Sequence, residues 1–363
     1  MASKTTNFNL HKIELTDAPP DITVLNQNWD TIDTQLKQAQ DDAATASEDA
    51  STALLTAERI EESLGESGSG KRVTRLTVGT STAGWTTKDC DYLCDGEEDD
   101  VEINEAIAAL PSSGGEVVLL DGTYYINDTI TLNKMDSTLR GNGTSTYLLR
   151  MFDGGYLINA TGYRCIVSDL YVDGASADGY SDTSNDEVCI KNDYSIVRDV
   201  TVCNSGGIGI WLDGDHCKVY GSTTEYCLYG ISIDGSMCTV TGNTCNCNLE
   251  YGINLCGTHN VVTGNVARLN EVANMRIFYG RQCTVVGNDF SVYNEDGGTT
   301  DSIYTSAANN TNNIVTNNNV GIGTVSVQGS NNVVGNPSYT YGTSDITAGS
   351  SSLTTGALYL VYE

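Results

Sequence analysis

Two aspartates near the middle of the chain have a spacing that would suit acid–base chemistry. Asp213 and Asp234 each precede a glycine at the end of a similar stretch, "IGIWLDG" and "YGISIDG". If these stretches lie in adjacent turns of a repeating structure, their carboxylates are roughly 5 to 7 Å apart, a separation that suits hydrolysis of a glycosidic bond. Asp213 would then be the acid and Asp234 the nucleophile or base. The same pair could instead hold a Ca²⁺ ion.

A structural corner is the simpler interpretation of these aspartates. Asp-Gly is a common turn sequence because both residues tolerate turn conformations. Asp173 also precedes a glycine, and we expect it in the same file as Asp213 and Asp234. The file should continue with Cys256 and Tyr279, which do no such chemistry. We therefore predict no resident metal or cofactor, with Ca²⁺ as the alternative, and favour a file of turns over a catalytic site.

Tyrosines supply the candidate surface for a ligand. The chain has 20 of them, and several are predicted on strand exteriors or in loops, beside Asn and Asp residues. Aromatic faces in such surroundings suit sugar rings, although outward tyrosine is also common on ordinary strands. Two predicted loops, 175–187 and 295–310, are where specificity is expected to reside. The candidate glycan-binding residues are Tyr180, Tyr220, Tyr226 and Tyr229.

A repeated five-residue unit would position these side chains. It reads as a small polar residue or Cys, any residue, Val or Leu, any residue, then Gly, Asp or Asn, and it begins at residues 137, 165, 195, 217, 238, 260, 283, 313 and 332. A period near 22 residues with short strands predicts a β-solenoid whose coils stack at about 4.8 Å. Uneven loops and short polar corners favour a right-handed coil. Alternation then predicts one interior file of Val219, Val240, Val262 and Val285, and another of Ile231, Ile253 and Ile277.

The 12 cysteines are predicted to be free thiols. Four of them occupy the first position of the repeated unit, which Ser195, Asn260 and Asn313 occupy in other copies. A position shared by Cys, Ser and Asn indicates stacking of small side chains, and the Cys spacings lack the paired CxxC or His pattern of a zinc site. The four are Cys165, Cys217, Cys238 and Cys283.

The rest of the chain divides by composition. Apolar residues at alternating steps of three and four from Ile22 to Leu64 predict a left-handed coiled coil between copies of the chain. A glycine- and serine-rich linker follows, and then a short amphipathic helix, Val101 to Leu110, that would cap the exposed end of the β stack. The predicted divisions are an N-terminal segment at 1–21, the coiled-coil helix at 22–64, the linker at 65–72, the first β-helix segment with its cap helix at 73–115, the parallel β-helix at 116–340 and a C-terminal β element at 341–363.

The charge excludes several function classes. The net charge of −29 argues against binding to nucleic acid, which requires a surface rich in Lys and Arg, and against binding to an anionic membrane surface.

The first residues contain no apolar signal region, and no run approaches the roughly 18 apolar residues of a membrane span. We therefore expect no membrane insertion and synthesis in a cytoplasm without a signal peptide.

Three stretches resemble parts of bacteriophage tail proteins. "TTNFNLHKIELTDAPPDITVLNQNWDTID" (5–33) resembles the virion-attachment N-terminus of tail fibres. "CDYLCDGEEDDVEINEAIAALPSSGGEVVLLDGTYYI" (90–126) resembles the opening segment of the pectate-lyase-like right-handed parallel β-helix superfamily as it occurs in phage tails. "ITAGSSSLTTGALYLVYE" (346–363) resembles a short end shared by many phage structural proteins.

The resemblance implies a homotrimeric tail fibre or tailspike in the virion tail, made in the cytoplasm of the bacterial host. Residues 1–21 would join it to other tail or baseplate proteins, and the β-helix would bind a host surface glycan. Enzymes of the superfamily cut polysaccharides, but the "GHG" and "RIK" strings of its galacturonases do not occur here. We therefore expect binding without catalysis. The alternatives are a polysaccharide-degrading hydrolase or lyase that uses Asp213 and Asp234, and a structural tail spacer with no ligand.

Overall fold

The structure, a computed structural model, describes residues 74–175, 179, 182–292, 301–305, 310–321 and 323–335. The predicted coiled coil, linker, N-terminal segment and C-terminal β element lie outside these residues, as does Tyr180. In the described ranges, no helix is long and apolar enough to cross a membrane.

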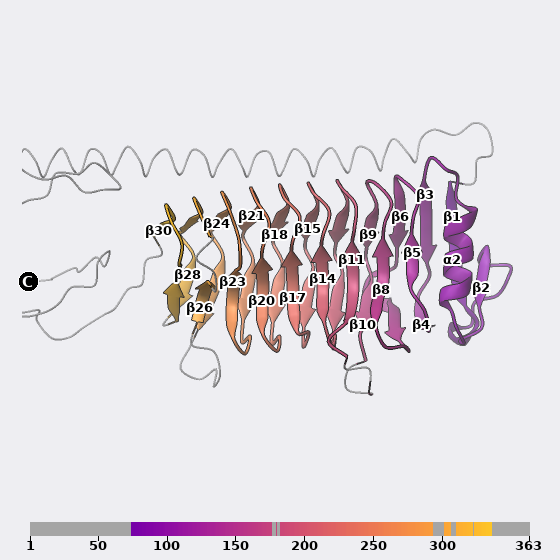
Figure 1. Cartoon of the computed structure of the whole chain (residues 1–363). Helices are drawn as coiled ribbons and strands as arrows, with labels where there is room; N and C mark the ends of the chain where they lie inside the picture. The colour runs from indigo at the N-terminus through magenta and orange to yellow at the C-terminus, as the bar shows by residue number, and fades with distance from the viewer. Residues whose placement is uncertain are drawn as a thin grey trace, which may run out of the picture. The chain divides into compact units, whose positions relative to one another are not determined.

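Three parallel sheets run along the described chain (Figure 1). Sheet 1 consists, in spatial order, of β2 (Tyr92–Cys94), β1 (Arg75–Thr80), β3 (Gly115–Leu119), β6 (Ser137–Arg140), β9 (Ile166–Ser168), β12 (Ile196–Arg198), β15 (Lys218–Tyr220), β18 (Thr239–Thr241), β21 (Val261–Thr263), β24 (Thr284–Val286), β27 (Ile314–Thr316) and β30 (Val333–Gly335). Sheet 2 consists of β4 (Gly122–Ile126), β7 (Thr146–Arg150), β10 (Tyr171–Asp173), β13 (Thr201–Cys203), β16 (Thr223–Glu225), β19 (Thr244–Asn246), β22 (Val266–Arg268), β25 (Asp289–Val292) and β28 (Asn319–Gly321). Sheet 3 consists of β5 (Ile130–Leu132), β8 (Gly155–Ala160), β11 (Asn185–Ile190), β14 (Ile208–Leu212), β17 (Tyr229–Ile233), β20 (Tyr251–Leu255), β23 (Ala273–Ile277), β26 (Asp301–Thr305) and β29 (Thr324–Ser326).

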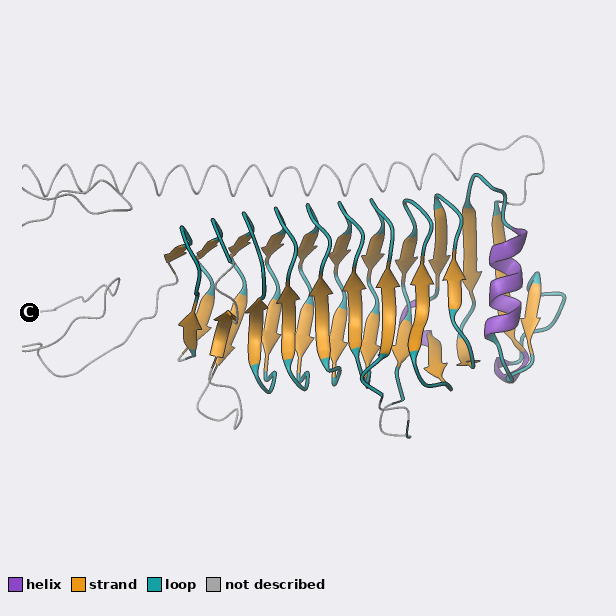
Figure 2. Cartoon of the chain, viewed as in Figure 1, coloured by secondary structure: helices purple, strands orange, loops and turns teal. Residues whose placement is uncertain are grey.

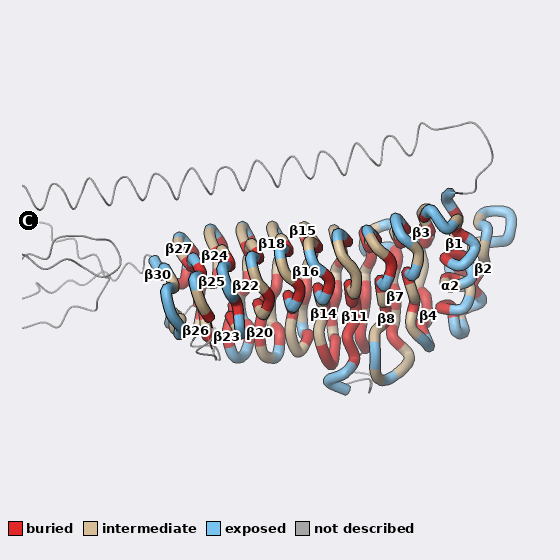
Figure 3. Tube along the Cα trace, turned by 45° about the horizontal axis from the view of Figure 1, so that its top comes forward, coloured by how far each residue is buried: buried red, intermediate tan, exposed pale blue. Residues whose placement is uncertain are grey.

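From β3 onward, each complete coil contributes one strand to each sheet, so the predicted β-helix is confirmed. The chain runs from β15 through β16 to β17 and then begins the next coil with β18, which pairs with β15 in parallel. The apolar side chains fill the inside of the coils, and Figure 3 shows buried residues recurring in every coil. Two short 3-10 helices, η1 (Ser81–Ala83) and η2 (Gly143–Ser145), lie near the first coils.

The predicted valine file is confirmed, whereas the isoleucine file needs one correction. Val219, Val240, Val262 and Val285 pair in sequence along sheet 1, and all four are buried. Ile231 pairs with Ile253, but the next residue of that file is Met275. Ile277 pairs instead with Leu255, in the neighbouring file. Paired residues of β20 and β23 are 22 positions apart in the sequence, as Leu255 and Ile277 show. Paired residues of β21 and β24 are 23 positions apart, as Val261 and Thr284 show. The extra residue of this repeat therefore lies after β23.

Buried asparagines hold the corners between sheets 1 and 2. Gly242, Gly264 and Gly287 have φ of 66°, 65° and 69°, a left-handed conformation that glycine adopts at little cost. The following residue in each coil is a buried asparagine. Asn265 Oδ1 accepts the backbone N–H of Asn243 at 3.0 Å and its side-chain amide at 2.9 Å. Asn265 Nδ2 donates to the Val240 carbonyl of the same preceding coil at 2.9 Å and to Asn288 Oδ1 of the following coil at 2.9 Å, so this asparagine bonds to the coils on both sides.

The position just before each strand of sheet 1 also carries small residues that form hydrogen bonds to a neighbouring coil. Cys165, Cys217, Cys238 and Cys283 are buried, and every cysteine in the described residues is a free thiol. The Cys238 amide donates to Asn260 Oδ1 at 2.7 Å, while its thiol donates to the Gly214 carbonyl at 3.3 Å. Cys and Asn can therefore alternate in this file, because each satisfies backbone groups of a neighbouring coil.

One helix covers the N-terminal end of the stack. Helix α2 (Asp100–Ala109) matches the predicted cap within one residue, and Figure 2 shows it beside the first strands. Ile103, Ala106 and Ile107 are buried against the first coil. The helix thus covers apolar side chains that the first coil would otherwise expose.

A buried ion pair joins the coil of β7 to the coil of β11. Arg150 Nε lies 3.1 Å from Glu187 Oε2, and both side chains are fully buried. Arg150 also donates to the Asp186 carbonyl at 2.6 Å, while Asp186 Oδ1 accepts the Ile208 amide at 2.8 Å. Burial raises the pKa of Asp186 to about 6, against opposing effects of the Ile208 bond and of the cations Arg150 and Lys191. Burial likewise raises the pKa of Glu187 to about 7 although Arg150 opposes it.

The asparagine ladder makes a prediction about stability. Asn265→Ala removes the acceptor of two bonds from Asn243 and the donor to Val240, and it leaves those groups buried. We expect the free energy of unfolding to fall by about 2 to 4 kcal/mol. The matched control is Asn133→Ala, because Asn133 is exposed, and it should change stability by less than about 0.5 kcal/mol. Urea unfolding of both variants measures the difference, and equal effects would contradict the role of the ladder.

The buried Asp186 makes a prediction about pH. Its folded-state pKa of about 6 exceeds the value of about 4 expected for the unfolded chain. The folded protein therefore binds this proton more tightly, and its contribution to stability is present below pH 4 and lost as the pH rises through 6. Asp186→Asn should raise the free energy of unfolding at pH 8 by about 1 to 3 kcal/mol, with no gain at pH 4. Asp121→Asn, at an exposed position, is the control, and a gain for Asp186→Asn that did not vary with pH would count against the prediction.

Candidate functional site

Aromatic and charged side chains gather on the outer face of sheet 3. Successive strands of this sheet pair Trp211 with Ser232, Ser232 with Asn254 and Asn254 with Arg276. These residues alternate with the buried Ile210, Ile231 and Ile253 files and so point away from the core. Small side chains thus lie between Trp211 and Arg276, which leaves one large aromatic ring and one long cation on the same face.

The first half of this face is built around Trp211. Its ring centroid lies 6.0 Å from that of Tyr156, and Lys191 Nζ lies 4.2 Å from the Trp211 ring and 4.8 Å from the Tyr156 ring. Lys191 also forms an ion pair with Asp213 Oδ2 at 3.1 Å. The indole Nε1 donates to Asp234 Oδ2 at 2.6 Å. Both predicted catalytic aspartates therefore belong to a network that fixes the orientation of the indole.

The second half of the face is built around Arg276. Its guanidinium carbon lies 4.1 Å from the centroid of the Phe278 ring and 4.8 Å from that of Tyr251. The Tyr251 ring lies 5.3 Å from Tyr229, which begins the preceding strand β17. A second cation is thus placed among three aromatic rings, on β23, which is the fourth strand of sheet 3 after β11, the strand that precedes Lys191.

Asp213 and Asp234 occupy equivalent corners of adjacent coils. The Asp213 amide donates to the Ile190 carbonyl and the Asp234 amide to the Leu212 carbonyl, each at the end of a strand in the preceding coil. This file continues with Cys256, as predicted, but its next residue is Phe278 and not Tyr279, because Phe278 donates to the Leu255 carbonyl. The additional residue in the following corner explains the shift. Both carboxylates are exposed.

Asp173 does not belong to this file, which corrects the sequence prediction. It ends β10 of sheet 2, where it pairs with Leu149 and Cys203. The error arose because "VDG" resembles "LDG" and "IDG" although it ends a strand of another sheet. Short motifs recur at more than one corner of a three-sided coil.

The candidate tyrosines lie on different parts of the surface. Tyr229 lies at the edge of the sheet 3 face beside Tyr251. Tyr220 ends β15 in sheet 1, and Tyr226 lies at the corner after β16, where it has φ of 56° and is 53% exposed.

Four residues of the sheet 3 face were not among the candidates from the sequence: Trp211, Tyr156, Tyr251 and Arg276. The signal available was that Trp211, Ser232, Asn254 and Arg276 fill the outward position of the second repeated stretch, which alternation could have identified.

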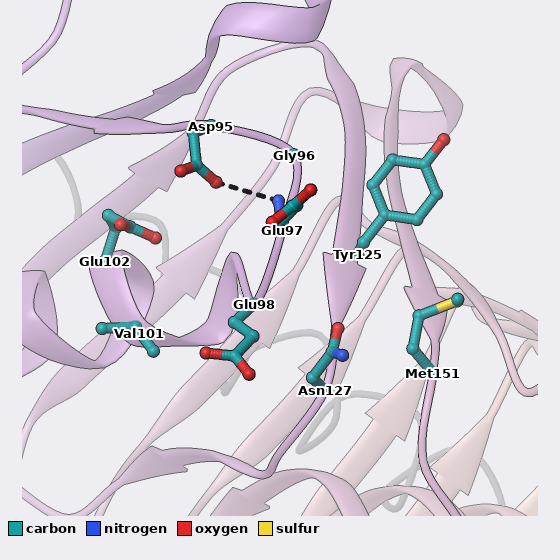
Figure 4. A pocket seen from close by; sticks show the side chains of 9 residues that line it. All are labelled: Asp95, Gly96, Glu97, Glu98, Val101, Glu102, Tyr125, Asn127 and Met151. Atoms are coloured by element: carbon teal, nitrogen blue, oxygen red, sulfur yellow. Dashed lines mark hydrogen bonds between the residues drawn. The ribbon is translucent and has the colours of Figure 1, made fainter.

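An acidic pocket of about 580 Å³ lies at the N-terminal end of the stack. Figure 4 shows Asp95, Glu98 and Glu102 on one side of its opening, with Tyr125 and Met151 on the other. The nearby Cys94, Asp99 and Glu102 have ligand atoms within 4.8 Å of one another, close enough to hold a cation. However, the Asp99 carboxylate already accepts the amides of Gly96 and Tyr125 at 2.9 and 2.8 Å. Burial also raises the pKa of Cys94, Asp99 and Glu102, which favours their protonated forms.

A family model described as a right-handed beta helix region matches residues 186–337, which is less than half of the chain. No match was found among curated proteins.

Several solved structures are similar in fold. The catalytic domain of Agl-KA superposes with a TM-score of 0.50 at 17% identity, over 62% of this chain and 45% of that one. The Dettilon tailspike protein gives 0.41 at 15% identity, over 62% and 59%. The A-module of mannuronan C-5 epimerase AlgE4 from Azotobacter vinelandii gives 0.43 at 14% identity, over 75% and 100%. This chain thus spans about half of the length of the first two proteins.

At these identities the likeness concerns the fold and not the activity. It agrees with the order of the sheets, in which every paired strand is parallel and each coil adds one strand to each sheet. The described part of this chain is therefore a right-handed parallel β-helix.

Proposed function

We propose that this chain is a tailspike-like bacteriophage tail protein that binds a host surface glycan through the outer face of sheet 3. The observation that carries the proposal is the position of Trp211, with Tyr156 beside it and Lys191 between the two rings. Sugar rings present apolar C–H faces that stack on an indole, while carboxylates and cations at the rim bond to their hydroxyl groups. The ion pair and hydrogen bond that hold Lys191, Asp213, Asp234 and Trp211 reduce the ordering that binding would require.

The second half of the face extends the proposed surface along the axis. Tyr229 and Arg276, both partly exposed, lie on the following coils beside the buried Tyr251, so an extended polysaccharide could contact several coils at once. An elongated ligand suits a repeating fold, because each coil adds a similar strip of surface at about 4.8 Å. Tyr220, Tyr226 and Tyr180 remain candidates for contacts outside this face.

The place of the chain in the particle is part of the same proposal. The heptads at 22–64 and the resemblance of residues 5–33 to virion-attachment segments support a homotrimer in the virion tail, joined to other tail or baseplate proteins through its N-terminus. The chain would be made in the cytoplasm of the bacterial host.

The proposed binding site can be tested with a panel of bacterial capsular and cell-wall polysaccharides. The full-length protein should bind at least one of them, with a change in tryptophan fluorescence. Trp211→Ala should weaken that binding by roughly tenfold or more, because a buried or stacked aromatic anchor carries much of the free energy of binding. The matched control is Trp85→Ala, since the Trp85 indole bonds to Asp121 near the N-terminal end of the stack.

Tyr220→Ala and Tyr226→Ala distinguish the sheet 3 face from the other surfaces. If these variants lost binding while Trp211→Ala kept it, the site would lie elsewhere on the protein. If no polysaccharide bound, the structural spacer would be the better interpretation. Repeating the measurement with a chelator, and then with Ca²⁺ added back, tests whether a cation takes part.

A polysaccharide-degrading enzyme is the second candidate, favoured by the position of Asp213 and Asp234 on adjacent coils of the same face. In that case, incubation with the bound polysaccharide should release new reducing ends or unsaturated sugars. Asp213→Asn and Asp234→Asn should each lower the rate by at least roughly a hundredfold while binding persists, because general acid–base groups contribute about that much. Asp121→Asn is the control. Binding with no shortening of the polysaccharide would leave the non-catalytic proposal standing.

A further inference from the structure

The strands of sheet 1 differ from those of the other two sheets in their charge. From β6 to β30, all in the described part of the chain, they contain no acidic residue, and Figure 1 shows several of them following one another along the stack. Strands of sheet 2, by contrast, contain Asp173, Glu225 and Asp289, and Asp301 begins a strand of sheet 3. Because the chain has a net charge of −29, sheet 1 is the side on which another acidic molecule would meet the least repulsion.

Five successive strands of this sheet present a surface without any charged residue. β18, β21, β24, β27 and β30 consist of Thr, Val and Ile with one Gly. The middle residues of the first four are buried, so the residues on either side of them point outward. Side chains that branch at Cβ have few rotamers, so this surface loses little entropy when another one covers it. The outward residues are Thr239, Thr241, Val261, Thr263, Thr284, Val286, Ile314, Thr316 and Val333.

The same face carries a cation without a carboxylate partner. Lys218 begins β15 and is half-buried on the outer side of the sheet. Among the described residues it forms no ion pair, whereas Arg140 of the same sheet pairs with Glu116 at 2.7 Å. Burial lowers the pKa of Lys218 and is the only cause of the shift, which agrees with the lack of a carboxylate nearby. A neighbouring molecule that supplied a carboxylate here would offset the cost of this desolvated charge.

The size of the face favours a second copy of this chain over a separate protein. β30 is the fifth strand of the sheet after β15, so the face is roughly 24 Å long and, with three residues per strand, about 10 Å wide. The resulting area of roughly 250 Å² is well below the 800 Å² or so that each partner buries in a stable interface. A free partner would therefore bind weakly, whereas copies held together by the predicted coiled coil at 22–64 have a high effective concentration and can use a small face.

We propose that the outer face of sheet 1, from β15 to β30, packs against the neighbouring copy of the chain in the assembled oligomer. In a closed three-fold ring, each copy presents one surface to one neighbour and a different surface to the other. The acidic residue that pairs with Lys218 would lie on that second surface. The inference rests on the homotrimer of the proposed function and assigns its contact to one sheet, which leaves the outer face of sheet 3 free for a glycan.

Photocrosslinking of the full-length protein identifies what covers the face. The oligomer is co-assembled from unlabelled and ¹⁵N-labelled chains, with a benzophenone amino acid in place of Thr263. The crosslinked peptides should include pairs of one light and one heavy chain that are joined within residues 74–335. The matched control carries the same amino acid in place of Thr244, which is half-buried on the outer side of sheet 2, and it should give no such pairs.

Three outcomes of this experiment would overturn the proposal. Crosslinks to residues 1–73 would show that the N-terminal part of the chain covers the face. Crosslinks that appear only after other tail proteins are added would assign the face to one of those proteins. Mixed pairs that form equally well from positions 244 and 263 would show that sheet 1 has no special part in the contact.

A charge placed on the face tests the same contact through stability. Thr263→Asp should lower the melting temperature of the assembled protein by at least about 3 °C more than Thr244→Asp does, because the contact would bury an unpaired carboxylate in every copy. Each substitution replaces an outward threonine of a three-residue strand, so the effects on the β-helix itself are matched. Equal shifts in the two variants would contradict the proposal.

Native mass spectrometry separates this inference from the function on which it rests. A trimer without mixed crosslinks from position 263 would overturn the sheet 1 contact and leave the homotrimer standing. A monomer would overturn both. The polysaccharide panel tests glycan binding separately in either case.

Discussion

The corner hydrogen bonds between successive coils are the constraint on which the rest of the structure depends. A coil must turn three times, and each turn buries amide and carbonyl groups that the sheets do not pair. Asn243, Asn265 and Asn288 meet this requirement by bonding through both side-chain atoms to the coils above and below. Because an unpaired buried polar group costs at least as much as a hydrogen bond contributes, these bonds fix the register of the coils that carry the asparagines. The preceding glycines with positive φ bring the backbone into the conformation that the ladder needs.

A fixed register between coils determines the positions of the outward side chains as well as those of the interior ones. Once Ile210, Ile231 and Ile253 superpose inside, Trp211, Ser232 and Asn254 must superpose outside. Each coil therefore contributes one row of side chains to the outer face of sheet 3, and successive rows lie next to one another along the axis of the β-helix. The larger residues Tyr156, Trp211 and Arg276 are partly exposed, whereas the small Ser232 and Asn254 between Trp211 and Arg276 are buried. The resulting face combines aromatic rings, two cations and two carboxylates on a scaffold that cannot shift by one residue without turning the strip inward.

One buried ion pair departs from the apolar interior, at the coil where residues 174–184 separate the strand of sheet 2 from that of sheet 3. Arg150 and Glu187 lie inside the stack at the coil that carries the segment after Asp173. A buried pair of this kind contributes little net stability, but removal of one partner leaves an uncompensated charge. The pair, with the bonds from Arg150 to neighbouring carbonyls, thus ties the interrupted coil to the coil before it. The raised pKa values of Asp186 and Glu187 make the stability of this coil depend on pH.

The sequence by itself determined the fold, the direction of stacking and much of the interior. The spacing of the repeated unit was sufficient to place Val219, Val240, Val262 and Val285 in one file and to identify the cysteine position as a buried stacking position, because equal coil lengths put equal positions above one another. Three residues were misplaced by the comparison of short motifs. A steady interval of 22 residues leads from Ile253 to Met275, so Ile277 was assigned by its motif and not by its spacing. A single extra residue after β23 shifts the corner that contains Tyr279, and Asp173 was misplaced because a three-sided coil repeats similar motifs on different sides. Only the tertiary structure decided which side of the coil each motif occupies. It also showed that Trp211, and not only the candidate tyrosines, lies beside Asp213 and Asp234. The reason is that the face on which a residue lies depends on the exact number of residues around each corner and not on the average period.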